Sequence, residues 1–174
     1  MSAIDYDLKK IRAIVFDIDG VLSPSVVGTD DNGRPVRMSN VKDGYAIHQA
    51  AMRGLRLCII SGGDAEPMRK RFSGLGISDI FMKVSEKLPV LRRWIAENGF
   101  SEGEVAYMGD DIPDLPSLRA VGLSACPYDA AHEVQQTVRY ISRFSGGYGC
   151  ARDLIEQVLR AKGEWCSDEK AYAW

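Results

Sequence analysis

Short, nearly continuous runs of apolar residues recur along the chain, and they limit its possible folds more than any other feature. Such runs are typical of strands that are buried on both faces of a sheet. They occupy residues 11–16, 55–60, 80–83, 104–108, 121–125 and 138–141. Between them, apolar residues at helical spacing predict helices over residues 44–53, 65–75, 86–98 and 151–162. This alternation predicts an α/β domain with a mainly parallel sheet.

Residues that commonly cap helices lie just before three of the expected helices. Asp43, Asp64 and Ser85 each precede an amphipathic stretch and are expected to be its N-cap. Gly54 and Gly99 follow two of these stretches, as expected at a helix C-terminus.

One segment interrupts the alternation of strands and helices. Residues 24–40 read PSVVGTDDNGRPVRMSN, in which two valine-bearing runs flank DDNG, a strong turn signal. We therefore expect a β-hairpin inserted just after the first strand. A length of 174 residues suits a single domain over residues 1–174. The polar tail, residues 163–174, is expected to be either loose or docked on another surface.

Charge and composition exclude several classes of protein. The net charge of -2 provides no basic field for nucleic acid, and no apolar run is long enough to span a membrane. The N-terminus lacks the apolar stretch of a secretory signal, so we expect a cytoplasmic protein. The four cysteines include no CxxC pair and the two histidines are far apart, which favours reduced thiols and no zinc site.

Open α/β sheets bind ligands at the carboxyl ends of their strands, and chemically capable residues follow four of the expected strands. They are expected to converge on one spot. The sets are Asp17, Asp19 and Gly20; Ser61, Gly62 and Gly63; Lys87; and Asp110, Asp111 and Asp114. Each set alone also suits an ordinary turn or a solvated helix surface, but the four in this order are highly specific.

Several carboxylates in one cleft repel one another, and a divalent cation removes that penalty. Ligands that are all oxygen suit Mg²⁺, which uses few carboxylates together with waters and a substrate phosphate. Asp17 and Asp110 are the expected carboxylate ligands.

Two aspartates one residue apart can divide the work of phosphate-ester hydrolysis. One carboxylate attacks phosphorus, and the other protonates the leaving alcohol and then activates water. Gly20 would let the backbone turn Asp19 toward the leaving group. Ser61 and nearby backbone N–H groups would bind the phosphoryl oxygens, and Lys87 would neutralise their charge.

These motifs resemble those of the haloacid dehalogenase (HAD) superfamily of phosphohydrolases. VFDIDG, IISGG, the lysine of SEKL and YMGDDIPD resemble its four motifs in order. The resemblance implies a Rossmann-like three-layer α/β/α fold in which Asp17 is the nucleophile and Asp19 the general acid and base. It also implies that Mg²⁺ binds the Asp17 and Asp110 carboxylates and the Asp19 backbone carbonyl, supported by Asp111 and Asp114.

Further segments resemble one subgroup, the 3-deoxy-D-manno-octulosonate 8-phosphate phosphatases and relatives that act on nine-carbon keto-sugar acid 9-phosphates. These segments are the hairpin, NVKDGYAI, the helix with Arg71, and GGYGCARDLI, and the resemblance covers roughly residues 8–163. It implies a homotetramer whose hairpins meet at the centre. Members often carry threonine at the position of Ser61 and arginine or glutamate at that of Gly63, so the eight-carbon and nine-carbon substrates both stay open.

The insertions are too short to form the cap domain that covers many HAD sites. A neighbouring subunit would therefore be needed to close the site. Gly62, Arg71 and Arg152 are expected to bind substrate, with Arg37 and Lys42 as further candidate anchors. Residues 146–152, which are rich in glycine, are expected to fold over a site or to cap the last helix.

Two rival interpretations fit the sequence less well than a phosphatase. A response-regulator receiver domain places its phosphorylated aspartate after a middle strand, whereas here DxD follows the first strand. A phosphatase-like oligomerisation scaffold tends to lose the nucleophile or the metal ligands. This chain keeps Asp17, Asp19, Lys87 and Asp110, which favours an enzyme.

Overall fold

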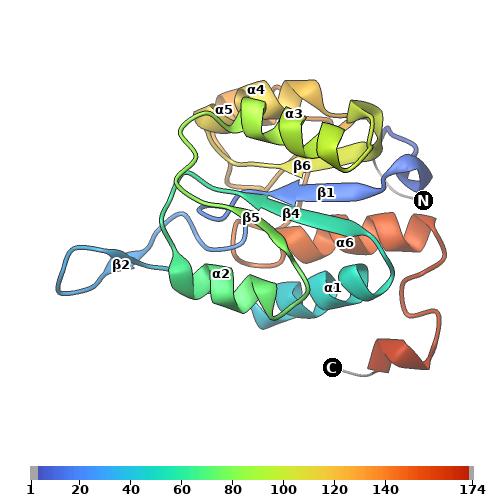
Figure 1. The fold of residues 1–174 in the computed structure, drawn as a ribbon, viewed down its shortest axis with the longest axis horizontal. Coiled ribbons are helices and arrows are strands. Elements are labelled where there is room, and N and C mark those ends of the chain that lie inside the picture. Colours follow the sequence, from blue (N-terminus) through green and yellow to red (C-terminus); the bar gives the residue numbers. More distant parts are fainter. Residues whose placement is uncertain (1–3, 173–174) are drawn as a thin grey trace.

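A six-stranded parallel sheet forms the middle layer of the protein (Figure 1), in a computed structural model that describes residues 4–172. The strand order is β5-β4-β1-β6-β7-β8. The predicted α/β class and all the predicted strands are confirmed. The strands are β1 Ala13–Phe16, β4 Arg56–Ile60, β5 Asp79–Phe81, β6 Val105–Met108, β7 Leu123–Cys126 and β8 Tyr140–Ile141.

Helices cover both faces of this sheet (Figure 1). One layer contains α1 Val41–Met52, α2 Glu66–Ser73 and α6 Cys150–Ala161, and the other contains α3 Lys87–Glu97, α4 Leu115–Ala120 and α5 His132–Gln135. The 3₁₀ helices are η1 Leu8–Lys10 before β1, η2 Glu102–Glu104 and η3 Ile112–Asp114 on either side of β6, and η4 Glu169–Tyr172 in the tail. Helices α4 and α5 were not predicted, because so few residues show no clear helical period. Among residues 4–172, no helix is long and apolar enough to cross a membrane.

Strand β1 shows why the apolar runs are unbroken. Its side chains alternate between the two cores: Ile14 and Phe16 pack on the side of α1, α2 and α6, while Ala13 and Val15 pack on the side of α3 and α4. All four residues are fully buried. A strand covered on both faces therefore needs an apolar side chain at every position.

The strand order places a crevice where the reactive residues are expected. From β1 the chain moves outward to β4 and β5, and it then returns to β6 on the other side of β1. In open α/β sheets, ligands bind at the carboxyl ends of strands where the order reverses in this way. Asp17 follows β1 and Asp110 follows β6, so both lie at this switch point.

The predicted N-caps need correction. Asn40, not Asp43, caps α1, because its side chain accepts from the backbone N–H of Lys42 at 2.8 Å. Neither Asp64 nor Ser85 caps a helix: the N-caps of α2 and α3 are Ala65 and Glu86, without side-chain hydrogen bonds, and Asp64 pairs with Lys83 instead. Several polar residues precede each helix, and sequence alone does not select among them.

The predicted hairpin is present. Strands β2 Gly28–Thr29 and β3 Pro35–Val36 pair antiparallel and extend away from the sheet (Figure 1). The Asp30 side chain closes the turn by accepting from the backbone N–H groups of Asn32 and Arg34, each at 2.9 Å.

The tail is docked, which resolves one of the two expected alternatives for its described part. Arg53, which follows α1, donates to the Glu164 carbonyl at 2.6 Å, and Gln49 donates to the Lys170 carbonyl at 3.2 Å. The Trp165 ring meets the Tyr45 ring edge-on, with centroids 5.9 Å apart. Residues 163–172 therefore cover α1, and residues 173–174 lie outside the described residues.

Asp43 joins two helices. It is 2 % exposed, and its Oδ1 accepts from the backbone N–H of Arg152 at 2.8 Å in the first turn of α6. Burial raises the pKa of Asp43 to about 6, although the backbone N–H groups of Arg152 and Gly149 oppose the shift. Ionising Asp43 therefore costs more in the folded than in the unfolded protein.

We predict that Asp43→Asn removes a pH-dependent loss of stability. The substituted amide keeps an oxygen for the α6 backbone but cannot ionise, so the wild type should lose stability relative to the variant as pH rises from 4 through 6. The full difference is on the order of 2 to 3 kcal/mol. Urea unfolding of both proteins at pH 4 to 7 measures it, and parallel pH curves would contradict the prediction.

Candidate active site

Asp17 lies at the first position beyond β1, on the carboxyl edge of the sheet. Its backbone N–H donates to the Met108 carbonyl of β6 at 3.1 Å, which continues the sheet pairing by one residue. Its Oδ1 accepts from the Ile18 N–H at 2.7 Å, and the residue is 7 % exposed. The backbone therefore fixes this carboxylate and leaves Oδ2 directed into the site.

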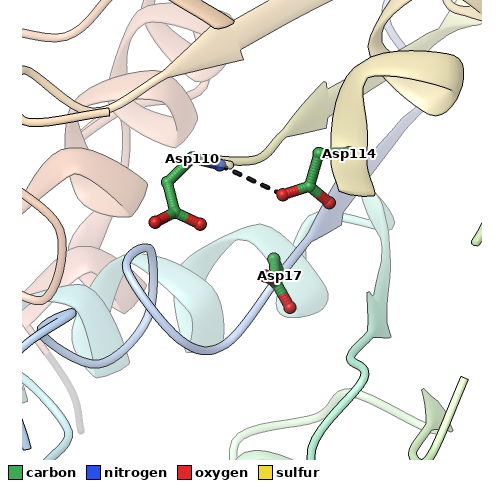
Figure 2. A group of neighbouring side chains, drawn as sticks. All are labelled: Asp17, Asp110 and Asp114. Carbon is green, nitrogen blue, oxygen red and sulfur yellow. Dashed lines mark hydrogen bonds between the residues drawn. The ribbon is translucent and has the colours of Figure 1, made fainter. Parts of the chain in front are cut away.

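Three carboxylates meet at the switch point (Figure 2). One oxygen each of Asp17, Asp110 and Asp114 lies within 4.8 Å of the others. The structure thus brings together Asp17 and Asp110 from opposite sides of the strand-order reversal. Asp114, expected only to support the metal shell, lies in the same group.

Two glycines allow the carboxylates to approach the backbone. Gly20 has φ +76°, and a Cβ built on it would lie 1.8 Å from an Asp110 carboxylate oxygen. A Cβ on Gly109 would lie 2.4 Å from the Asp114 carboxyl carbon. Gly20 was expected to redirect the backbone, and the structure shows that it also makes room for Asp110.

Lys87 forms a buried bridge between two of the acids. Its Nζ lies 2.9 Å from Asp17 Oδ2 and 2.7 Å from Asp114 Oδ1. Burial alone would lower the pKa of Lys87, but the attraction of Asp17 and Asp114 outweighs it and raises that pKa. Lys87 therefore stays charged beside the expected nucleophile, and its role in neutralising phosphoryl oxygens remains a prediction.

Tyr107 supports the same group and was not predicted. Its hydroxyl donates to Asp114 Oδ1 at 2.7 Å, and the residue is fully buried in β6. In the sequence, Tyr107 is only another apolar member of a strand run. A tyrosine two residues before GD could have been noticed, because a buried tyrosine hydroxyl needs a hydrogen-bond partner.

The electrostatics of the acids fit a cation. Burial, and then repulsion by Asp114, raises the pKa of Asp17 to about 6. Burial, and then repulsion by Asp17 and Asp114, raises the pKa of Asp110 to about 8. A divalent ion would relieve both effects, and carboxylate oxygens are the ligands that Mg²⁺ prefers.

Asp19 lies outside this carboxylate group, held by an arginine from the hairpin segment. Its Oδ1 accepts from Arg37 Nε at 2.6 Å, and its Oδ2 accepts from Arg37 Nη2 at 2.8 Å. Arg37 was expected as a possible substrate anchor, and its pairing with the expected general acid was not foreseen. The carbonyl of Asp19 remains a predicted metal ligand.

Ser61 follows β4 directly, at the same carboxyl edge of the sheet as Asp17, and is 1 % exposed. Its Oγ accepts from the Gly63 N–H at 3.3 Å, and its carbonyl accepts from the Val84 N–H at 3.1 Å. The second contact ties Ser61 and Gly62 to the loop that leads to Lys87. The placement agrees with a role in binding phosphoryl oxygens, which remains a prediction for Ser61 and Gly62.

The structure does not bring the two expected substrate arginines to the carboxylates. Arg71 lies in the last turn of α2, at the opposite end of that helix from the loop that follows Ser61. The Arg152 guanidinium stands over the Trp165 ring at 5.3 Å and donates to Glu156 at 3.4 Å. Asp111 is exposed, and its backbone N–H donates to Asp114 at 3.4 Å.

The glycine-rich loop 146–152 closes over the turn after β1. A Cβ on Gly146 would lie 1.9 Å from the Gly20 carbonyl oxygen, and the Gly147 N–H donates to the Val21 carbonyl at 2.7 Å. This loop also leads into α6, which begins at Cys150. The loop therefore lies against the turn that contains Gly20 and also supplies Gly149, the N-cap of α6, while a role in covering the site remains a prediction.

Comparisons with known proteins agree with this geometry. The chain is 33 % identical over 156 residues to the 3-deoxy-D-manno-octulosonate 8-phosphate phosphatase KdsC of Escherichia coli K12, covering 90 % of this chain and 83 % of the relative. It matches a probable YrbI family phosphatase from Pseudomonas syringae at TM-score 0.90 and 35 % identity, covering 97 % of this chain and 96 % of the other. No protein-family model matches.

A third match is a 3-deoxy-D-manno-octulosonate 8-phosphate phosphatase from Moraxella catarrhalis, solved with a magnesium ion, a phosphate ion and KDO. Its TM-score is 0.85 at 29 % identity, covering 89 % of each chain. The fold and the grouped aspartates are those of a HAD-type phosphatase. Within that class, the chain belongs to the 3-deoxy-D-manno-octulosonate 8-phosphate phosphatase (KdsC) family.

We predict that Mg²⁺ binding displaces protons from this site. Because the pKa of Asp110 is raised to about 8 and that of Asp17 to about 6, affinity should rise with pH and level off near pH 8. The expected slope is up to about tenfold per pH unit between pH 6 and 8.

Calorimetry in buffers of different ionisation enthalpy counts the displaced protons. Asp110→Asn should weaken binding and flatten the pH dependence, whereas Asp31→Asn, on the exposed hairpin turn, should change neither. Binding without proton release would show that the carboxylates are already ionised.

Proposed function

We propose that the protein is a Mg²⁺-dependent phosphomonoesterase that hydrolyses 3-deoxy-D-manno-octulosonate 8-phosphate to 3-deoxy-D-manno-octulosonate and phosphate, in lipopolysaccharide precursor synthesis. The grouping of Asp17, Asp110 and Asp114 around one point, with Lys87 between two of them, carries the proposal. Family membership and the M. catarrhalis complex support the choice of substrate.

In this mechanism Asp17 is the nucleophile. One of its oxygens attacks phosphorus and the ester oxygen leaves, which forms an aspartyl-phosphate. Lys87 holds the attacking carboxylate at 2.9 Å and neutralises the transferred phosphoryl group, while Ser61 binds a phosphoryl oxygen. Asp19 gives a proton to the leaving alcohol. It then takes a proton from the water that attacks the phosphorus of the aspartyl-phosphate, which breaks the bond to the Asp17 oxygen, releases phosphate and restores the Asp17 carboxylate.

Asp17 and Asp110, with the Asp19 backbone carbonyl, would hold the Mg²⁺ ion, and Asp111 and Asp114 would support that shell. The bound ion would shield the anionic phosphate from the anionic nucleophile. Asp114 has a second task in this scheme, because it fixes Lys87 at 2.7 Å and is itself fixed by Tyr107.

Two alternatives follow from the sequence. The first is a phosphatase for a nine-carbon keto-sugar acid 9-phosphate, since Gly63 has no side chain with which to choose between sugar acids. The second is an inactive oligomerisation scaffold, which the intact set of Asp17, Lys87 and Asp110 argues against.

A phosphate-release screen tests the proposal. The substrates are eight- and nine-carbon 2-keto-3-deoxy sugar acid phosphates beside generic sugar phosphates. We expect kcat/KM to be highest for the eight-carbon acid and to require Mg²⁺. Asp17→Asn should reduce turnover by at least about a thousandfold with the fold intact by circular dichroism. A preference for the nine-carbon acid would select the alternative.

We further propose a cytoplasmic homotetramer in which the hairpins meet at the centre. Val26, Val36, Met38 and Val41 are exposed by 53 to 85 % along the hairpin segment and the start of α1. Such a patch is typical of an interface. With no cap domain, the open site gains cover from neighbours, and Arg71 of one subunit can serve another. The four free cysteines suit a reducing compartment.

The tetramer yields a prediction on assembly. The double variant Val26→Asp/Val36→Asp should dissociate in sedimentation velocity, because two charges would be buried in the interface. Its kcat/KM should fall about tenfold or more while its secondary structure is unchanged. Tyr172→Asp, also exposed but outside the hairpin, is the matched control. A wild-type monomer with full activity would refute the proposal that neighbouring subunits cover the site.

A further inference from the structure

Arg37 and Asp19 form a bidentate ion pair at the edge of the site. Both oxygens of the Asp19 carboxylate are occupied, at 2.6 Å by Nε and at 2.8 Å by Nη2 of Arg37. The Arg37 side chain is only 9 % exposed, whereas that of Asp19 is 41 % exposed. Asp19 is therefore the exposed member of the pair and the one that can be displaced, while Arg37 is held in place by its surroundings.

Gly63 provides the space for this guanidinium. A Cβ built on Gly63 would lie 2.6 Å from Arg37 Nη2 and 3.2 Å from Asp19 Oδ2. Any larger residue there would displace the end of the arginine, because this end is the flexible partner. Gly63 and Arg37 are thus fitted to each other, although they come from different segments.

The pair opens onto a cleft between the hairpin and the start of α2. The cleft has a volume of about 740 Å³ and is lined by Arg34, Arg37, Gly63, Pro67 and Met68 among others. Asp30, Asp64 and Glu66 line the cleft as well, so an anion would be attracted by the Arg37 guanidinium itself and not by a net positive charge of the cleft. The apolar side chains of Pro67 and Met68 suit a sugar ring. Arginine binds any carboxylate in the same bidentate geometry in which it binds Asp19.

The ion pair conflicts with the role of Asp19 in catalysis. With both oxygens directed at Arg37, neither is directed at the ester oxygen that must leave. A carboxylate in the cleft can take over the guanidinium, because it offers the same two acceptor oxygens. Asp19 is then released to turn toward the reacting phosphate.

We propose that Arg37 is a specificity-determining residue: the carboxylate of a sugar acid phosphate replaces Asp19 as its partner, and Gly63 keeps the space for the exchange. This inference rests on the proposed function only in that the substrate carries a carboxylate as well as a phosphate. A phosphate ester without a carboxylate leaves Asp19 bound to Arg37, and its turnover is slow.

Kinetics on two substrates test the exchange. We compare the wild type, Arg37→Met and Arg37→Lys on 3-deoxy-D-manno-octulosonate 8-phosphate and on arabinose 5-phosphate, which has no carboxylate. For Arg37→Met, kcat/KM on the acid should fall at least about tenfold, mainly through KM. On arabinose 5-phosphate kcat should stay equal or rise. Equal losses on both substrates would overturn the proposal.

Variants at Gly63 test whether Arg37 acts on the choice of substrate or only on the stability of the fold. Gly63→Ala should displace Arg37 and reduce selectivity in the same direction, and the double variant Gly63→Ala/Arg37→Met should be no worse than Arg37→Met alone. Arg92→Met, which also removes one arginine–carboxylate pair but lies on α3, is the matched control. Methylguanidinium should restore part of the lost activity to Arg37→Met. Additive losses would count against the shared mechanism.

Binding measurements keep this inference separate from the proposed function. Free 3-deoxy-D-manno-octulosonate, which has the carboxylate and no phosphate, should bind Arg37→Met at least about tenfold more weakly than the wild type, while inorganic phosphate should bind both equally. If Arg37→Met instead binds inorganic phosphate more weakly than the wild type does, Arg37 binds the phosphoryl group and the inference is wrong. If turnover fails but this difference remains, the proposed reaction fails and the inference stands.

Discussion

The repulsion among three closely grouped carboxylates, two of them buried and one partly buried, is the constraint on which the site depends. One oxygen each of Asp17, Asp110 and Asp114 lies within 4.8 Å of the others, and burial strengthens their repulsion. Nothing in the local sequence favours such an arrangement. It is imposed by the sheet, because the reversal of strand order at β1 puts the ends of β1 and β6 side by side. The packing and the hydrogen bonds of the whole sheet therefore hold the three carboxylates together against their mutual repulsion.

The fold compensates for part of this repulsion and leaves the rest. Lys87 enters from α3 and bridges Asp17 and Asp114, so two of the charges are partly balanced within the chain. Asp110 is not bridged in this way, and burial and repulsion raise its pKa further than that of Asp17. A cation bound beside Asp110 would therefore relieve the part of the repulsion that Lys87 leaves unbalanced. Gly20 is needed for the same reason, since any side chain there would displace Asp110.

The sequence was sufficient for those features that depend on periodicity and strand ends. The parallel sheet, the hairpin and the meeting of Asp17 with Asp110 follow from unbroken apolar runs and from what comes after them. Features that depend on contacts between distant segments were not predictable. In the sequence, Tyr107 is one more apolar residue of a strand, and only the structure shows that its hydroxyl donates to Asp114. Asp43 looks like a cap for α1, yet it serves α6, more than a hundred residues later.

The hairpin segment has one feature that the sequence predicted, its turn, and one that it did not, the partner of Arg37. The sequence DDNG predicted the turn. It did not predict that Arg37 pairs with Asp19, because this contact joins the hairpin segment to the loop after β1. By resemblance, relatives often carry a charged side chain at the position of Gly63. Here that position has none, and the guanidinium of Arg37 lies where a side chain on Gly63 would begin, with Nη2 2.6 Å from the position of a Cβ. A positive charge beside Asp19, the predicted general acid, is thus supplied from the hairpin segment. The unusual glycine and the unpredicted ion pair are therefore one feature of the site rather than two.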